Sequence, residues 1–260
     1  MLFRSGANGL IGTEMAAKAA ADGHTLLAGG TATIAVNPSL YTKIPFDAAR
    51  DFAPIALIAY STSVLVTHPS VAARTIGELI ALAKAKPGEI RYASAGAGST
   101  PHLSAELFRL SAGVNLVHVP YKGSTPGVIA TISGETAMMF TGVASAIAHI
   151  KAGRLRALSV NGPRRSSALP EVPTAGESGL PGFEVDFWIG FLARAGTAAP
   201  VIARLNDEVN RVIAQDDVRD RLVTLGTDPV GGSPAQFAQV IRSDLAKWAK
   251  AIQASGAKAE

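Results

Sequence analysis

The chain has 260 residues, of which 48% are hydrophobic and 17% are charged, and this composition excludes a disordered chain, because disorder requires low hydrophobicity with high net charge. Its net charge of +4 comes from Lys and Arg residues that are scattered rather than gathered into a basic run, so we expect no nucleic-acid partner. The absence of Cys excludes a disulfide framework and a thiolate metal site, and no apolar run reaches the roughly 18 residues of a membrane span.

The first third of the chain alternates between helix and strand patterns. An Ala-rich stretch ends at Asp22-Gly23, which is a helix stop, and a short apolar run follows it. Thr75 and Glu78 have the spacing of a capping box, so we expect a helix to begin there and to end at Pro87-Gly88. The elements predicted here are a helix over 13–21, strands over 24–28, 53–60 and 63–67, and the helix that Thr75 caps.

The middle of the chain repeats one arrangement three times: a β-rich run, a turn of small residues, and the start of a helix. In Thr100-Pro101 and Thr125-Pro126, Thr is the expected N-cap and Pro fits the first helical position. A loop-rich stretch and three amphipathic helices complete the chain. Strands are predicted over 90–94, 116–119, 136–140, 155–160 and 188–193.

The alternation of strands and helices predicts an α/β fold with mostly parallel sheets. The later change to consecutive helices predicts that the C-terminal part packs back on the first part of the chain, giving two lobes with two hinge crossings. We expect lobe 1 to comprise residues 1–62 and 190–260, and lobe 2 to comprise residues 63–189.

Side chains suited to catalysis are sparse. The five histidines are far apart in the sequence and lack the His-x-x-x-His spacing of a zinc site. Gly96-Ala97-Gly98-Ser99 approaches both a nucleophile elbow and a dinucleotide fingerprint, but its spacing fits neither. No paired acid and base is evident, so we expect no enzymatic activity, no metal and no cofactor.

The predicted helix starts offer a different chemistry, because the first N–H groups of a helix are unpaired and carry positive partial charge. Three helices are predicted directly after strands 90–94, 116–119 and 136–140, and parallel strands end at a common sheet edge where α/β folds bind ligands. Each turn alone is better explained as an ordinary capped βα turn, whereas the three together predict an anion site. The hydroxyl groups expected to add neutral donors are those of Ser99, Thr100, Ser124 and Thr141.

Eight short motifs occur in a fixed order along nearly the whole chain. They are GANGLIG (6–12), AADGHTLL (20–27), NPSLY (37–41), YASAGAGSTPHL (92–103), VPYKG (119–123), HIKAGRLRAL (149–158), VPT (172–174) and WIG (188–190). Each is weak alone, but in this order and spacing the sequence resembles the Bug (TctC-type) periplasmic solute receptors of tripartite tricarboxylate transport systems.

The resemblance implies a two-lobed periplasmic-binding-protein (type II) fold that closes on a small carboxylate without catalysis. The implied partners are that carboxylate and the membrane permease of a tripartite tricarboxylate-type transporter, the implied location is the periplasm, and we expect a monomer. The family's ligand loops match Gly30, Thr31, Ala32, Thr33, Ala97, Gly98, Ser99, Thr100, Tyr121, Lys122, Gly123, Ser124, Thr141 and Gly142.

Two departures from the family pattern affect these expectations. The chain begins without the signal peptide and first strand that family members carry, so we expect it to be truncated and to lack part of its pocket. Phe140-Thr141 stands where many relatives have Phe-Asp, which removes a counter-charge for a ligand ammonium and favours a simple carboxylate over an amino acid. The alternative function is the effector-binding module of a transcriptional regulator that shares this fold.

Overall fold

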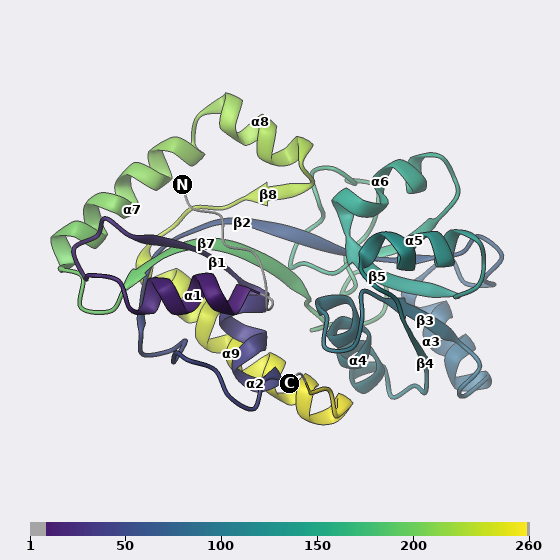
Figure 1. Cartoon of the computed structure of the whole chain (residues 1–260). Helices are drawn as coiled ribbons and strands as arrows, with labels where there is room; N and C mark the ends of the chain where they lie inside the picture. The colour runs from purple at the N-terminus through teal and green to yellow at the C-terminus, as the bar shows by residue number, and fades with distance from the viewer. Residues whose placement is uncertain (1–8, 259–260) are drawn as a thin grey trace. The chain divides into compact units, whose positions relative to one another are not determined.

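The computed structural model describes residues 9–258, in which helices and strands alternate for most of the length (Figure 1). The first three residues of the predicted 6–12 motif, and the expectations about the start of the chain, lie outside the described residues. The chain divides into two compact units. Unit 1 contains the residues up to Tyr60 together with Phe187–Leu222 and the residues from Pro229 onward, and unit 2 contains Ser61–Asp186 and Val223–Asp228.

Unit 1 is an antiparallel strand pair, extended by a third strand and accompanied by helices. Strand β1 (Leu26–Gly30) runs antiparallel to β7 (Asp186–Arg194), and β7 in turn neighbours β2 (Phe52–Thr67). The long helix α9 (Pro234–Ser255) packs against a π-helical segment, η2 (Thr31–Val36), and against α2 (Asn37–Leu40). The other helices of this part of the chain are α1 (Leu10–Ala17), α7 (Ala199–Ile213) and α8 (Asp216–Thr224).

Unit 2 contains the strands and helices that carry the three repeated turns. Strand β3 (Arg91–Ser94) runs parallel to β4 (Val117–Pro120) and to β5 (Met138–Gly142). The second part of β2 runs antiparallel to β5 and to β6 (Arg156–Val160). The helices of unit 2 are α3 (Ile76–Ala85), α4 (Thr100–Ala112), α5 (Ser124–Ile132) and α6 (Val143–Lys151).

The α/β class is confirmed, but the sheet is mixed rather than mostly parallel. Strand β3 is joined to β4 through α4, and β4 is joined to β5 through α5, and such crossovers are what parallel strands require. Strand β2 pairs with β5 and with β6 in the antiparallel sense, and a short strand that the sequence analysis missed, β8 (Thr227–Pro229), also pairs with β2.

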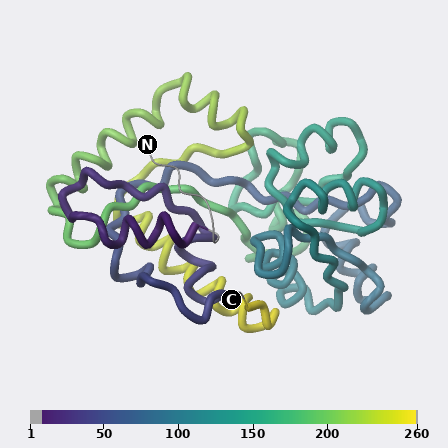
Figure 2. The backbone as a smooth tube through the Cα atoms, in the orientation of Figure 1, coloured from purple at the N-terminus to yellow at the C-terminus, as the bar shows by residue number. Residues whose placement is uncertain are grey.

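Strand β2 is a single strand of 16 residues where the sequence analysis predicted two strands with a break at 61–62 (Figure 2). The polar residues there do not interrupt the strand because they have hydrogen-bond partners. The Thr62 hydroxyl donates to Asp228 Oδ2 at 2.5 Å, and the neighbouring Ser63 carbonyl accepts from the Asn161 N–H at 2.8 Å.

The chain passes between the units four times, at 60/61, 186/187, 222/223 and 228/229, instead of the two hinge crossings predicted. The extra passes place residues 223–228, which the sequence analysis assigned to lobe 1, in unit 2. Asp228 is held there by the Ser167 backbone N–H and hydroxyl, at 3.2 and 2.6 Å. Gly226 lies so close to Ala144 that a Cβ at Gly226 would come within 3.0 Å of it.

Two of the predicted helix starts are shifted, that of α4 by one residue and that of α5 by two. The cap of α4 is Ser99, whose Oγ accepts from the His102 N–H, so Thr100 is the first helical residue and Pro101 follows it. Helix α5 begins at Ser124, after Gly123 at φ 111°, and has no side-chain cap. The start of α3 is as predicted, since the Thr75 hydroxyl accepts from the Glu78 N–H at 3.1 Å.

Each unit has its own core. In unit 1, Trp188 and Trp248 are fully buried, and Trp188 makes an edge-on contact with Phe237 at 5.1 Å between ring centroids. In unit 2, Val64 and Val66 of β2 pack with Met139 of β5. Among the described residues, no helix combines the length and apolar character that crossing a membrane requires.

A buried polar link in unit 1 gives a test of this packing. Trp188 Nε1 donates to Asp244 Oδ2 at 2.7 Å, and Lys247 pairs with the other carboxylate oxygen at 2.7 Å. Replacing Asp244 with Ala leaves the buried indole N–H without an acceptor, so we expect a loss of about 1–3 kcal/mol in the free energy of unfolding. Both tryptophans of the chain belong to unit 1, so urea unfolding followed by tryptophan fluorescence measures the loss directly.

The matched control for this measurement is Asp207→Ala, at an exposed position within α7. This change should alter the free energy of unfolding by no more than about 0.5 kcal/mol. Equal unfolding midpoints for the two variants would show that the Trp188–Asp244 hydrogen bond does not stabilise unit 1.

Candidate functional site

The three turns that follow β3, β4 and β5 lie along one edge of the unit 2 sheet. These strands are parallel neighbours, with Ala93 opposite both Val119 and Met139, so their carboxyl ends point to the same edge. Helices α4, α5 and α6 begin directly after them. The ten predicted site residues of unit 2 lie at this edge: Ala97, Gly98, Ser99, Tyr121, Lys122 and Gly123 in the turns, Thr100 and Ser124 at the first positions of α4 and α5, and Thr141 and Gly142 at the end of β5.

The turns after β3 and β4 are joined to each other by backbone hydrogen bonds. The Tyr121 N–H donates to the Ser94 carbonyl at 3.1 Å, and the Gly123 N–H donates to the Ala95 carbonyl at 3.3 Å. The turn after β5 is next to Ser61 of β2, because a Cβ placed on Gly142 would lie 3.7 Å from the Ser61 Oγ. Ser61 therefore belongs to this edge. The sequence analysis missed it because it treated positions 61–62 as a break between strands.

Two of the three helix starts leave their N–H groups open to an external acceptor. Helices α5 and α6 begin after Gly123 and Gly142, and neither has a side-chain cap. The first N–H groups of an uncapped helix need acceptors from outside the helix, and a bound anion can supply them. The start of α4 differs, because Ser99 caps it. The sequence analysis treated the three starts as equivalent, whereas the structure makes those of α5 and α6 the stronger anion donors.

The predicted hydroxyl donors separate into two groups. The Ser99 hydroxyl donates to the Gly96 carbonyl at 2.6 Å, so its proton serves the turn, which corrects the expectation that it is a ligand donor. The hydroxyl of Thr141 is buried, and its Oγ1 has no hydrogen-bond partner among the described residues. An orphaned buried hydroxyl is costly unless a ligand or water completes it, so Thr141 remains the strongest candidate donor. Thr100 and Ser124 are half-buried at the first positions of α4 and α5.

The charge of this edge is weakly positive. Within turns 95–100, 120–125 and 141–145 the only ionisable side chain, apart from that of Tyr121, is the exposed ammonium of Lys122, and there is no carboxylate. Recognition here would therefore depend on N–H and O–H dipoles with one flexible cation, which suits an anion and offers no carboxylate counter-charge for a ligand ammonium.

The other four predicted residues, Gly30, Thr31, Ala32 and Thr33, lie in unit 1 where β1 passes into η2. The Thr33 hydroxyl donates to the Gly30 carbonyl at 3.1 Å, so it stabilises the start of η2. Buried Thr31 accepts from the Trp188 N–H at 2.8 Å and keeps its own proton for another acceptor. The sequence alone could not distinguish these two threonines.

A stacked pair of histidines lies directly behind the turn after β3, contrary to the expectation that the histidines are far apart. The rings of His102 on α4 and His118 on β4 are 4.1 Å apart and inclined by 14°. Tyr92 of β3 stacks on His118 at 4.9 Å. The first turn of α4 lies over the β3–β4 pair, and this tertiary contact joins residues that are 16 positions apart. Among the described residues, no cluster of His, Asp and Glu has the arrangement of a metal site.

The histidine pair is electrically neutral near pH 7. Burial lowers the pKa of His102, and burial together with the charge of His102 lowers the pKa of His118 to about 4. The Gly98 N–H donates to His102 Nδ1 at 3.0 Å, which requires that this nitrogen be unprotonated.

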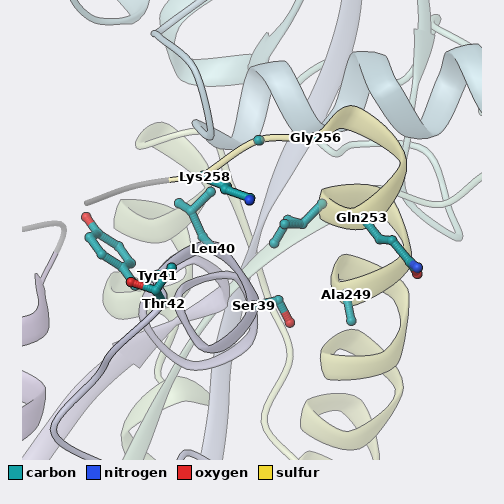
Figure 3. A pocket seen from close by; sticks show the side chains of 10 residues that line it. Ser39, Leu40, Tyr41, Thr42, Ala249, Gln253, Gly256 and Lys258 are labelled. Atoms are coloured by element: carbon teal, nitrogen blue, oxygen red, sulfur yellow. The ribbon is translucent and has the colours of Figure 1, made fainter.

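Two cavities lie away from the three turns. One, of ≈ 320 Å³ in unit 1, is formed by residues 39–42 and the last turns of α9, and in Figure 3 Gln253 points away from Leu40. The other, of ≈ 450 Å³ in unit 2, lies beside residues 69–74, where Arg156 donates to the carbonyls of Val71 and Ala73 at 3.0 and 3.1 Å. Neither cavity is lined by a predicted site residue.

Comparison with known proteins identifies a family that matches nearly the whole chain. The sequence profile described as "Tripartite tricarboxylate transporter family receptor" (TctC) matches residues 3–257. Protein BugT of Bordetella pertussis is 37% identical over 256 residues, which cover 98% of this chain and 78% of BugT.

Two solved structures that resemble this chain contain carboxylates. Rpa4515 of R. palustris, with adipate, is 32% identical with a TM-score of 0.80, over 97% of this chain and 85% of that one. MatC (Rpa3494) of Rhodopseudomonas palustris, with bound malate, is 30% identical with a TM-score of 0.75, over 95% of this chain and 85% of that one. Because the family profile matches residues 3–257 and the relatives align with nearly the whole chain, the chain belongs to the TctC family of tripartite tricarboxylate transporter receptors.

Proposed function

We propose that this protein is a periplasmic receptor that captures a small carboxylate and delivers it to the permease of a tripartite tricarboxylate-type transporter. Family membership supports the receptor role and the periplasmic location. The observation that carries the ligand class is the edge of unit 2, where two uncapped helix starts and the unpartnered Thr141 hydroxyl occur in turns without a carboxylate. The adipate and malate of the related structures are ligands of the same chemistry.

In this proposal, the first N–H groups of α5 and α6 hold one carboxylate group of the ligand. Thr141 adds a hydroxyl donor, and Lys122 adds a flexible positive charge at the rim. Ala97, Gly98, Ser99 and Thr100 shape the neighbouring wall, with Ser99 as a cap rather than a donor. Within unit 1, Thr31 is proposed as a hydroxyl donor of its own unit, because its oxygen already accepts from the Trp188 N–H and its proton is unused.

The same chemistry favours a simple carboxylate over an amino acid. A ligand ammonium needs an acceptor, and position 141, where we expect Asp in many relatives, is Thr in this chain. We further propose that the protein is a monomer without catalytic activity. The matching family consists of transporter receptors, which favours this function over the effector module of a regulator.

A ligand panel tests the proposal. We expect adipate or malate to raise the melting temperature in a thermal-shift assay, because a ligand at 100 times its Kd stabilises the folded state by about 2.7 kcal/mol. Glutamate and alanine should give no shift, because no carboxylate faces their ammonium group. Isothermal titration then gives the Kd of each ligand that binds. A panel in which only the amino acids bind would contradict the ligand class.

Substitution of Thr141 tests the contact itself. Thr141→Val removes a hydroxyl that has no partner within the described protein, so stability should be unchanged or slightly raised. The affinity for the carboxylate should fall by roughly 5- to 20-fold, the equivalent of about 1–2 kcal/mol for one lost hydrogen bond. Isothermal titration at pH 7.5 measures this change.

Thr131→Val is the matched control, because Thr131 is also buried but its hydroxyl is bonded to Gly127 and Thr136, at 2.9 and 3.0 Å. That variant should lose stability and keep its affinity. If Thr141→Val binds as tightly as the unmodified protein, Thr141 does not contact the ligand.

A further inference from the structure

The two glycines of the turn after β3 are each connected to one of the stacked histidines. The Gly98 N–H donates to His102 Nδ1 at 3.0 Å. The Gly96 N–H donates to the Ser94 Oγ at 3.1 Å, and that Oγ is 2.6 Å from His118 Nε2. Both glycines have positive φ, 120° and 73°, a region that glycine adopts without steric cost. The shape of the turn therefore depends on the imidazole pair.

We propose that His102 and His118 are positioning residues for the carboxylate site, which as neutral stacked rings hold the 96–99 turn in its binding conformation and release it when they take up protons. This inference rests on the function proposed above and adds the regulation of that same site.

Protonation would break the hydrogen bonds that define the turn. When Nδ1 of His102 carries a proton, it becomes a donor that faces the Gly98 N–H, also a donor, so the hydrogen bond is lost. Two charged imidazoles 4.1 Å apart also repel each other in a buried setting. The neutral pair thus favours the observed turn, and the charged pair disfavours it.

The surrounding charged groups do not compensate for protons on the rings. Glu106 of α4 is the nearby carboxylate, and its oxygens are already engaged by the Tyr92 hydroxyl and by Arg109, each at 2.9 Å. Arg109 is itself a cation. Tyr92, on β3, is kept uncharged because burial raises its pKa far above its ordinary value. The groups that face the pair from β3, β4 and α4 therefore leave both rings neutral at pH 7.

The direction of the pH effect follows from the lowered pKa values. An unfolded His has a pKa near 6.5, so the unfolded chain takes up protons first as the pH falls. The contribution of the neutral pair to stability is complete above about pH 6.5, and it declines as the pH falls toward the folded-state pKa, which is about 4 for His118. In the folded protein the rings take up protons only near their folded-state pKa, so retention of the turn, and with it the ligand, should decline as the pH approaches that lower value.

The first part of the experiment needs no ligand. In protein labelled with ¹⁵N, we expect the ring nitrogens of His102 and His118 to titrate well below pH 6.5, with Nδ1 of His102 unprotonated at pH 7.5. The amide resonances of Gly96 and Gly98 should move with the same midpoint. Ring nitrogens that titrate at 6.5 or above, or glycine amides that stay fixed while the rings titrate, would overturn the proposal.

The second part measures the Kd of adipate and malate between pH 7.5 and 4.0. The double variant His102→Asn/His118→Gln keeps amide groups near the positions of Nδ1 and Nε2 but cannot titrate, so its pH profile reports only the ionisation of the ligand. We expect the unmodified protein to lose about 2-fold more affinity over this range than the double variant, because half of the His118 rings carry a proton at the folded-state pKa of about 4. Parallel profiles would overturn the proposal.

His68→Asn is the matched control, because His68 Nδ1 also accepts a backbone N–H, from Ser70 at 3.2 Å, but lies away from the turn. It should follow the profile of the unmodified protein. If no carboxylate binds at pH 7.5, the proposed function fails, and the glycine and histidine resonances still decide whether the pair controls the turn. If the double variant does not fold, the resonances of the unmodified protein decide in the same way.

Discussion

The parallel register of β4, β3 and β5 is the constraint on which the candidate site depends. Because these strands run in the same direction as immediate neighbours, the three turns that leave them must lie along one edge, and each turn must start a helix to return the chain. The helix starts then gather unpaired N–H groups at that edge. The turns consist mainly of small residues, so a ligand can approach the backbone. No individual side chain creates this arrangement.

The repeated strand–turn–helix units could be predicted from sequence because their signals are local. A β-rich run followed by small residues identifies each unit, with a Thr-Pro pair in the first two, and α4, α5 and α6 follow the predicted strands. The parallel or antiparallel direction of each strand pair was harder to predict, because it depends on where β2 and β6 pair within the sheet. The crossings of Val223–Asp228 were missed for the same reason, since Asp228 is held by Thr62 and by Ser167, far away in the chain.

At the candidate site, the sequence predicted which segments lie at the sheet edge, but not which hydroxyl and imidazole groups have hydrogen-bond partners. Ser99 and Thr141 are both hydroxyl residues in small-residue turns, yet one donates to Gly96 and the other has no partner among the described residues. The difference lies in side-chain direction and burial, which local sequence does not encode. His102 and His118 appeared unrelated for the same reason, because their contact arises only when α4 folds back over β4.

Recognition by N–H and O–H dipoles, rather than by full charges, is also consistent with the uncharged state of the two histidines behind the turn after β3. A full positive charge from His102 or His118 close to the site would strengthen the hold on an anion, but it would also disrupt the hydrogen bonds that shape the turn. Keeping both rings uncharged leaves binding to N–H groups, a hydroxyl and one exposed Lys. Such a set holds an anion without a buried ion pair, whose separation would cost several kcal/mol. In the proposed function, a receptor that passes its ligand to a permease needs a low barrier to release, and the scarcity of charge at this edge fits that requirement.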